Sequence, residues 1–315
     1  MSLHIVAANR LANRHIDSIH AIHPDAVITT CKESELAHHL PSADILIAWG
    51  QMNIDQYLPT ATKLRWIHSL SAGVETILSP AVQESSILLT NVRGIHGIPM
   101  SEHVFGMMLA VSRGMAGFTK HQASSSWQRL PLTELYNKTL CIVGLGSIGR
   151  EIAKRAKAFN MRVVATKRTL TEELFVDELC TPDELDRLLA ESDYVVLTVP
   201  QTPDTVGLFD YERISRMKST AMLINVARGS IVSEEGLVQA LREQKIAFAA
   251  LDVFATEPLD ATSPLWQMDN VLITPHCAAI SPLYLDRAIQ CFAENLARYL
   301  QDKPMLNLID KLRGY

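Results

Sequence analysis

The sequence predicts an α/β protein of two domains, each built on a parallel sheet with helices on both faces. Two observations predict this fold class. The chain has 315 residues, more than one compact core usually covers. Short apolar runs alternate with helix-compatible segments over most of its length, and such runs are typical of parallel strands buried on both faces. We therefore expect two doubly wound parallel sheets.

The first hundred residues predict a small α/β unit. Four apolar runs predict strands: HIVAA (4–8), ADILIAW (43–49), LRWIHSL (64–70) and SILLTN (86–91). Residues 98–118 then predict one long helix that is apolar on nearly all sides at its middle. Such a helix must be buried in a domain junction, in a subunit interface or simply in a core.

A regular series of strands and helices follows residue 138. The predicted strands cover 139–144, 162–166, 194–200, 221–227, 247–254 and 270–275. Predicted helices over 150–159, 181–192 and 234–243 separate several of them, the second with Thr181 and Glu184 as a capping box. A last helix begins near Ser281 and carries an apolar stripe of Ala288, Ile289, Phe292, Leu296 and Tyr299. This order of elements is that of a doubly wound sheet.

The composition supports a folded chain and narrows its partners. Hydrophobic residues make up 48% of the chain and charged residues 20%, which provides for sizeable cores and shows no disordered signature. The formal net charge of −5 predicts no clustered basic surface for nucleic acid or an anionic membrane. We expect a soluble globular protein without nucleic-acid or membrane partners.

Neither a targeting segment nor a metal motif stands out in the sequence. The longest strongly apolar stretch, residues 104–111, is too short to span a bilayer, and the N-terminal apolar run is too short for a signal peptide. The five cysteines have no CxxC spacing, and the histidines form no HExxH pair. We expect reduced thiols, a cytoplasmic location and no metal site.

The segment 144–149, GLGSIG, predicts a dinucleotide-binding turn. Gly144 allows the tight turn, Gly146 allows a pyrophosphate to approach the backbone, and Gly149 lets the following helix pack on the strand. The pyrophosphate then lies at the helix N-terminus, where free N–H groups favour negative charge. A strand pattern precedes the motif and a helix pattern follows it, which is the context that supports it. The predicted cofactor-binding residues here are Gly144, Gly146, Ser147, Ile148 and Gly149.

Two cations stand where a dinucleotide site would read the adenosine ribose. That position lies about twenty residues beyond the turn, at the end of the second strand. Lys167, eighteen residues after Gly149, is followed by Arg168. An acid there would accept a hydrogen bond from the ribose 2′-hydroxyl, whereas Lys167 and Arg168 attract a 2′-phosphate. The pair favours NADP(H) over NAD(H); the alternative is that both side chains simply point into solvent.

An arginine, a carboxylate and a histidine follow three consecutive strands of the second half. Arg228 follows the strand at 221–227, Glu257 the next, and His276 the last. Ligands of parallel sheets bind at the carboxyl ends of the strands. Reduction of a ketoacid by hydride transfer needs a cation for the carboxylate and a donor that protonates the oxygen. Arg228 suits the first role and His276 the second, with Glu257 favouring the imidazolium. Singly, each residue also has an ordinary structural explanation.

Four segments carry a family resemblance: VGLGSIG (143–149), NVARGSIV (225–232), ALDVFATEPL (250–259) and NVLITPHCAAIS (270–281). They resemble the signature segments of the D-isomer-specific 2-hydroxyacid dehydrogenases, and the likeness covers nearly the whole chain. ATKRT (165–169) is similar to the NADPH-dependent glyoxylate/hydroxypyruvate reductases of that family. The resemblance implies a Rossmann-type NADP-binding domain over residues 101–282. It also implies a smaller, flavodoxin-like substrate domain, formed by residues 1–100 together with 283–315, and a cleft that closes on the substrate.

The resemblance also implies roles for single residues. Arg228, Glu257 and His276 match the catalytic triad, and Asp252 matches the acid that holds the nicotinamide carboxamide. SLSAGVETI (69–77) resembles the substrate loop, so we expect the carboxylate of a small 2-ketoacid to bind amides around Ser71, Ala72, Gly73 and Val74, with Trp49 shaping the pocket. Residues 100–130 are implied to form a homodimer interface. The implied activity is NADPH-dependent reduction of glyoxylate to glycolate and of hydroxypyruvate to D-glycerate.

Three departures from the family pattern and two alternatives stay open. Asn137 replaces a common Gly at a turn, VET (74–76) replaces the commoner VD, and Cys277 and Ala279 replace an apolar residue and a Gly beside His276. The last two affect the expected shape of the substrate pocket. One alternative is a dehydrogenase for another 2-ketoacid, such as a bulkier one or phosphohydroxypyruvate. The other is a dinucleotide sensor without turnover.

Overall fold

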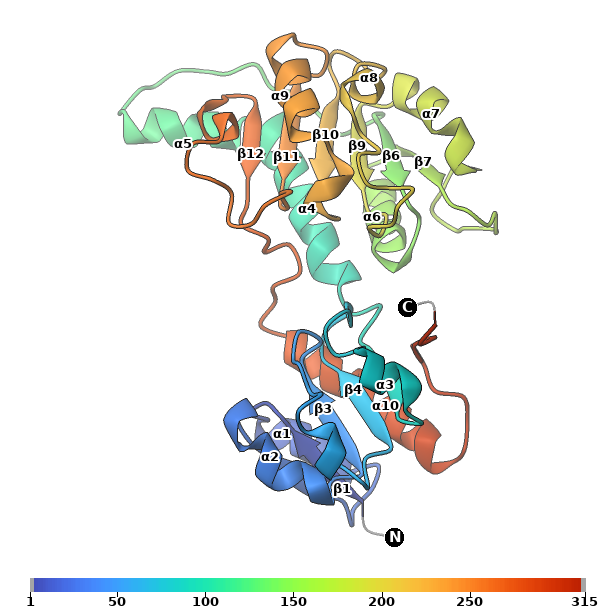
Figure 1. Ribbon diagram of the computed structural model, residues 1–315. Coiled ribbons are helices and arrows are strands. Elements are labelled where there is room, and N and C mark those ends of the chain that lie inside the picture. Colours follow the sequence, from blue (N-terminus) through green and yellow to red (C-terminus); the bar gives the residue numbers. More distant parts are fainter. Residues whose placement is uncertain (1–2, 313–315) are drawn as a thin grey trace. The chain divides into compact units, whose positions relative to one another are not determined.

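The computed structural model describes residues 3–312, and Figure 1 shows their elements along the chain. Backbone contacts divide the chain into one unit of Met1–Ile95 with Ser281–Tyr315 and a second unit of His96–Ile280. Residues 1–2 and 313–315, the outer ends of the predicted substrate domain, lie outside the described residues. The first break falls just before a helix that begins at Gly97, whereas we predicted it at residue 100, in the first turn of that helix. The second break precedes the predicted boundary at 282.

The first unit is a five-stranded parallel sheet with the order β2-β1-β3-β4-β5. Its strands are β1 (His4–Ala7), β2 (Val27–Thr30), β3 (Ile45–Ala48), β4 (Trp66–Ser69) and β5 (Leu88–Thr90). Its helices are α1 (Asn13–His20), α2 (Leu36–His39), α3 (Pro80–Glu84) and α10 (Tyr284–Leu300). Helices α1 and α10 cover one face of the sheet, and α2 and α3 the other. The order is that of flavodoxin-like sheets.

The second unit is a seven-stranded parallel sheet with the order β12-β11-β10-β9-β6-β7-β8. Its strands are β6 (Thr139–Val143), β7 (Arg162–Thr166), β8 (Glu178–Cys180), β9 (Tyr194–Leu197), β10 (Met222–Asn225), β11 (Phe248–Leu251) and β12 (Val271–Ile273). Its helices are α4 (Gly97–Ser112), α5 (Met115–Ala123), α6 (Ser147–Ala158), α7 (Leu185–Glu191), α8 (Tyr211–Ile214) and α9 (Glu234–Arg242). The order reverses at β6, as in the Rossmann fold, so the predicted fold class is confirmed.

Two apolar cores enclose the second sheet. Alternate residues of its strands pack with α4 and α6 on one face and with α7, α8 and α9 on the other. The predicted apolar face of α9 is buried, whereas Phe159 lies just beyond the end of α6 and is 37% exposed. Burial on both faces explains why these strands are continuous apolar runs.

The structure corrects three predicted helices. The helix expected over 98–118 is two helices, because Gly114 adopts a φ of +66° between α4 and α5. The apolar middle of α4 is buried in the core that it shares with α6. Thr181 makes no side-chain cap, and residues 182–184 form a 3-10 turn before α7, so the capping box is absent there. Helix α10 begins at Tyr284, three residues after Ser281.

Two strands were not predicted, β2 and β8, and each is an edge strand of its sheet. None of the four residues of β2 is buried, and only the last of the three in β8 is. Because these two strands are less buried than the inner strands, their sequences are not continuous apolar runs. Within residues 3–312, no helix is long and apolar enough to cross a membrane.

Candidate functional site

The three glycines after β6 have the surroundings that a dinucleotide turn requires. Gly144 has a φ of +96°, and a Cβ there would lie 2.5 Å from Cγ1 of Val199. A Cβ on Gly149 would lie 3.0 Å from Ile142, where α6 packs on β6. A Cβ on Gly146 would meet no atom within 4 Å, so the space beside its Cα is open. The residues present therefore fit a pyrophosphate approaching the backbone at Gly146.

Helix α6 begins at this turn without a side chain that caps it. Gly146 is the N-cap, and Ser147 and Ile148 are the first two helical residues. Ile148 packs its side chain against the core shared by α4 and α6. The first backbone N–H groups of a helix have no partner inside the helix, and the helix dipole favours an anion there. The predicted residues 144–149 are thus arranged as an anion-binding turn.

Lys167 and Arg168 lie at the predicted strand end, and both meet carboxylates. Lys167 follows β7 directly, and its Nζ lies 2.9 Å from Oε1 of Glu173. Arg150, in the first turn of α6, donates to both carboxylate oxygens of Glu173, at 2.7 and 2.8 Å. These hydrogen bonds, that of Arg150 first, hold the pKa of Glu173 well below its usual range. Arg168 lies 3.5 Å from Asp204 and is largely exposed.

His276 and Glu257 form a hydrogen-bonded pair. Nδ1 of His276 lies 2.7 Å from Oε2 of Glu257, and because a carboxylate only accepts, Nδ1 carries the hydrogen. The other oxygen of Glu257 accepts from the N–H of Phe254 at 2.9 Å, which fixes the carboxylate. His276 has a φ of +50°, which is uncommon for a residue with a side chain and is typical of functional positions. Its side chain is 52% exposed, so Nε2 is available to a ligand.

Asp252 is a buried carboxylate that holds the chain around His276. It is 1% exposed and accepts hydrogen bonds from the hydroxyl of Thr274 (2.6 Å) and from the N–H groups of Cys277 and Ala278 (both 2.9 Å). Its own carbonyl accepts from the N–H of His276 at 2.8 Å. Asp252 thereby holds residues 274–278 in place, His276 among them.

Nε2 of His103 in α4 lies 3.6 Å from the same carboxylate, and it donates to Thr274 Oγ1 at 3.0 Å, because the hydrogen of that hydroxyl is donated to Asp252. His103, Asp252 and Cys277 thus bring three potential metal ligands within 4.8 Å of one another. Burial, and then the charge of Asp252, raise the pKa of the Cys277 thiol, which disfavours the thiolate that a metal needs. Three protein donors hold the Asp252 carboxylate, so the group is stabilised without a cation, and Oδ2, which accepts only from Ala278 within the described chain, can take one more donor.

Arg228 lies in a loop that is braced by Asn225 and Gly229. The amide of Asn225 donates to the carbonyl of Arg228 at 3.0 Å, and its oxygen accepts from the N–H of Ala227. A Cβ on Gly229 would lie 1.8 Å from the carbonyl carbon of Phe254, so the loop after β10 presses on the loop that carries Glu257. Burial and the charge of Arg228 lower the pKa of His96. Arg228 itself is exposed.

Among residues 69–74 of the first unit, the backbone is shaped by its own hydrogen bonds. The N–H of Ser71 donates to Oγ of Ser69 at 3.1 Å, so this amide is not free for a ligand. The side chain of Asn91 donates to the carbonyl of Ala72 at 2.6 Å. Ala72, Gly73 and Val74 donate no backbone N–H to another group of the described chain. Trp49 stacks on Tyr284, with ring centroids 5.8 Å apart.

Comparison with known proteins supports one family. The family model for the NAD binding domain of D-isomer specific 2-hydroxyacid dehydrogenases matches residues 105–278. The chain belongs to this family. It is 32% identical over 287 residues to a glyoxylate reductase of Pyrococcus furiosus, covering 88% of this chain and 85% of that protein.

Solved structures of family members match this chain over nearly its full length. A family protein from Aeromonas salmonicida has a TM-score of 0.88 and 35% identity, with coverage of 99% of this chain and 100% of that one. A D-isomer specific 2-hydroxyacid dehydrogenase from Xanthobacter autotrophicus, solved with NADPH and MES, has a TM-score of 0.84 and 28% identity over the whole of both chains.

The chain spans about half the length of several curated relatives that it matches. It is 35% identical to the D-3-phosphoglycerate dehydrogenase of Synechocystis over 84% of this chain and 48% of that protein. The 2-hydroxyacid dehydrogenase family therefore supplies the fold and a nicotinamide dinucleotide site, while relatives with different substrates resemble this chain to a similar degree.

Sequence reasoning missed several residues of this dehydrogenase site. Arg150 directly follows the last glycine of the turn, and its position in the first turn of α6 could have been read from the motif. Glu173 follows Lys167 by six residues in a segment without periodicity, so no local pattern marks it. His103 reaches Asp252 only because α4 packs beside the sheet, and Thr274 reaches it because β12 pairs with β11.

Proposed function

We propose that this dehydrogenase reduces small 2-ketoacids with NADPH, glyoxylate to glycolate and hydroxypyruvate to D-glycerate. The observation that carries the proposal is the His276–Glu257 pair, which follows the last two strands of the sheet that carries the glycine turn. The likeness to glyoxylate reductases supports the substrate class, and the NADPH-bound relative supports the cofactor. The cofactor supplies a hydride for the ketone carbon.

His276 is the proton donor in this proposal. Glu257 holds Nδ1, so Nε2 of the imidazolium faces the reacting oxygen and delivers a proton as the alkoxide forms. The carboxylate of Glu257 balances the imidazolium charge and keeps the ring in one orientation. Arg228, exposed at the end of β10, is the cation for the substrate carboxylate. Asp252 is proposed to hold the nicotinamide carboxamide, next to the chain that carries His276.

The substrate loop and the cofactor turn complete the proposal. Backbone N–H groups of Ala72, Gly73 and Val74 are proposed to bind the substrate carboxylate. Ser71 is proposed to shape this loop, because its N–H donates to Ser69 and its hydroxyl accepts from the N–H of Gly50 and donates to Gln51. Trp49 is proposed to shape the pocket. Residues 144–149 are proposed to hold the pyrophosphate, and Lys167 and Arg168 the 2′-phosphate.

Initial rates with His276→Ala test the proton donor. We expect wild-type enzyme to consume NADPH with glyoxylate and hydroxypyruvate, and His276→Ala to lose about 10²–10⁴-fold in kcat, the share of a positioned acid. Binding of NADP⁺ should stay unchanged, because Nε2 faces the substrate. His38→Ala, which removes an exposed histidine of the first unit, is the matched control and should keep full activity. Near-normal turnover of His276→Ala would refute the assignment.

The relatives that act on phosphoglycerate favour one second candidate, reduction of 3-phosphohydroxypyruvate. The same assay with this ketoacid separates the two. A kcat/KM for phosphohydroxypyruvate above those for glyoxylate and hydroxypyruvate would favour the second candidate.

A cytoplasmic homodimer is part of the proposal. Met115 and Trp127 are exposed within residues 100–130, the segment that we expect at the interface, and Tyr136 is exposed just beyond it. Light scattering of the purified chain measures the assembly directly.

A further inference from the structure

The loop between β7 and β8 places a carboxylate on the cations that are proposed to bind the cofactor. Oε1 of Glu173 accepts from Lys167 Nζ, from the Thr171 hydroxyl at 2.9 Å and from Arg150. Oε2 accepts the second hydrogen bond of Arg150. Three donors therefore converge on one oxygen, and the chain itself fills this oxyanion site.

A 2′-phosphate would use the same donors. The end of the second strand of a dinucleotide-binding sheet is where the adenosine ribose is read, and Lys167 is the first residue after β7. A phosphate offers three oxygens to Lys and Arg donors, whereas a hydroxyl offers one hydrogen to an acceptor. The carboxylate of Glu173 can accept a hydrogen bond from a ribose 2′-hydroxyl. As an anion, it also competes with a 2′-phosphate for the same cations.

Lys167 and Glu173 are partly shielded from solvent, so solvent screens their charges less than those of exposed pairs. The side chain of Lys167 is 22% exposed, that of Glu173 is 10% exposed, and that of Arg150 is 48% exposed. Arg168 and its partner Asp204 are 66% and 84% exposed, so solvent screens that pair more strongly. The carboxylate of Glu173 therefore opposes an incoming phosphate more effectively than Asp204 does.

We propose that Glu173 sets the choice between NADP(H) and NAD(H) in this protein. The inference rests on the dinucleotide binding of the proposed function. A 2′-phosphate must displace the carboxylate from Lys167 and Arg150, while a free 2′-hydroxyl donates to it and leaves the ion pairs in place. The loop thus supplies the acid that the strand end lacks, and the preference for NADP(H) is smaller than the cations alone would produce.

Binding of cofactor fragments tests this inference. Calorimetry measures the Kd of 2′-phospho-ADP-ribose and of ADP-ribose for the wild-type chain and for Glu173→Gln. We expect Glu173→Gln to tighten 2′-phospho-ADP-ribose about tenfold, as removal of one nearby like charge implies, and to weaken ADP-ribose or leave it unchanged. Glu172→Gln, which removes the same charge one residue earlier from an exposed side chain, is the matched control and should leave both values within about twofold.

Several outcomes would overturn the inference. The inference fails if the ratio of the two Kd values is the same in Glu173→Gln as in Glu172→Gln. It also fails if Glu173→Gln weakens both fragments equally, because Glu173 would then only order the loop. Failure of the wild-type chain to bind either fragment would overturn it as well. Glu173→Asp keeps the charge on a shorter side chain, should give an intermediate ratio, and replaces the Gln variant if that variant does not fold.

The fragments carry neither nicotinamide nor substrate, so their binding is independent of ketoacid reduction. A chain that reduces no ketoacid but shows the shifted ratio would keep the inference and lose the proposed function. A chain that reduces ketoacids but shows no shift in the Kd ratio would keep the proposed function and lose the inference.

Discussion

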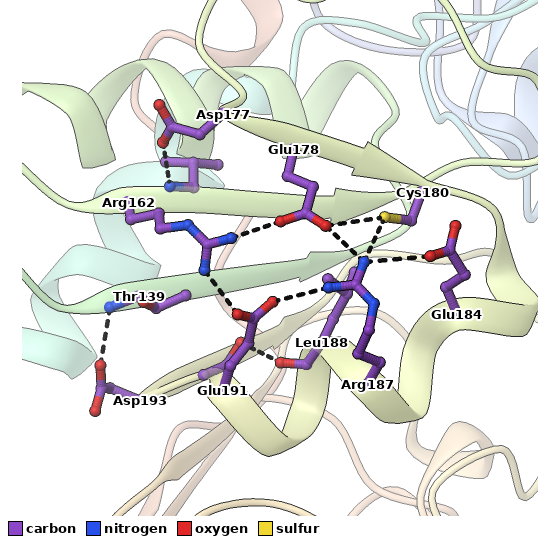
Figure 2. Close-up of polar contacts among 12 residues, drawn as sticks. Thr139, Arg162, Asp177, Glu178, Cys180, Glu184, Arg187, Leu188, Glu191 and Asp193 are labelled. Atoms are coloured by element: carbon purple, nitrogen blue, oxygen red, sulfur yellow. Dashed lines mark hydrogen bonds and ion pairs between the residues drawn. The ribbon is translucent and has the colours of Figure 1, made fainter.

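Strand β7 has a charged cluster at each end, and the two clusters differ in the sign of their excess charge. At the first end, shown in Figure 2, Arg162 pairs with Glu178 at 2.5 Å and with Glu191 at 2.9 Å. Arg187 of α7 contacts the same two carboxylates and Glu184 as well. Two cations there share three carboxylates.

At the other end of β7, Arg150 and Lys167 share the single carboxylate of Glu173. Both ends combine basic side chains with glutamates, but here a positive charge is left over. Ligands of a parallel sheet bind at the carboxyl ends of its strands. The comparison teaches that ion pairs of similar geometry can have different roles. The first cluster ties β7, β8 and α7 together, whereas the second leaves a positive charge where we propose that the cofactor binds.

The largest expected effect comes from removing a cation at each end in turn. Lys167→Ala should weaken 2′-phospho-ADP-ribose about 10–100-fold, because a hydrogen bond to a charged group contributes about 1.5–3 kcal/mol. ADP-ribose should change much less. Arg162→Ala, the matched change at the first residue of the same strand, should leave both Kd values unchanged. Equal effects of the two variants in calorimetry would abolish the distinction between the clusters.

A smaller effect is expected from salt. Raising the ionic strength shortens the Debye length and screens the charges around Glu173, that of half-exposed Arg150 more than that of Lys167. The advantage of 2′-phospho-ADP-ribose over ADP-ribose should therefore shrink several-fold between about 0.05 M and 0.5 M salt, with most of the change in the phosphorylated fragment. A salt-independent ratio would mean that shape rather than charge discriminates between the fragments.

The smallest effect concerns stability at the first end of β7. Arg162→Met should lower the free energy of unfolding by about 0.5–1 kcal/mol in urea near neutral pH, because the pairs are half-exposed. The hydrogen bond from Arg187, and then the charges of Arg187 and Arg162, lower the pKa of Glu178 in the folded chain.

A carboxylate with a lowered pKa stabilises the fold above its unfolded pKa and loses this contribution as the pH falls. The difference between Arg162→Met and wild type should therefore shrink as the pH falls from about 7 to about 3. A difference that grows on acidification would contradict the network in Figure 2.

Local patterns were sufficient for the inner strands and for the turn. The continuous apolar runs of β6, β7, β9, β10 and β11 follow from burial on both faces, which any chain must satisfy at the centre of a parallel sheet. The glycines at 144 and 149 were predictable because a Cβ there would collide with Val199 or crowd Ile142. The glycine at 146 was predictable because a side chain there would occupy the space that a pyrophosphate needs. Asn137, expected at a turn, has a φ of +58°, which Asn tolerates.

The sequence by itself determined the fold class, the turn at 144–149 and the strand ends that carry Arg228, Glu257 and His276. Only the tertiary structure decided the edge strands β2 and β8, the break at Gly114 and the partners of Lys167. The physical reason is the range of the interactions. Burial periodicity and backbone sterics act within a few residues and leave a pattern in the chain. The ion pairs of Glu173 with Arg150 and Lys167 join a helix, a strand end and a loop, and their charges carry no pattern until the fold brings them together.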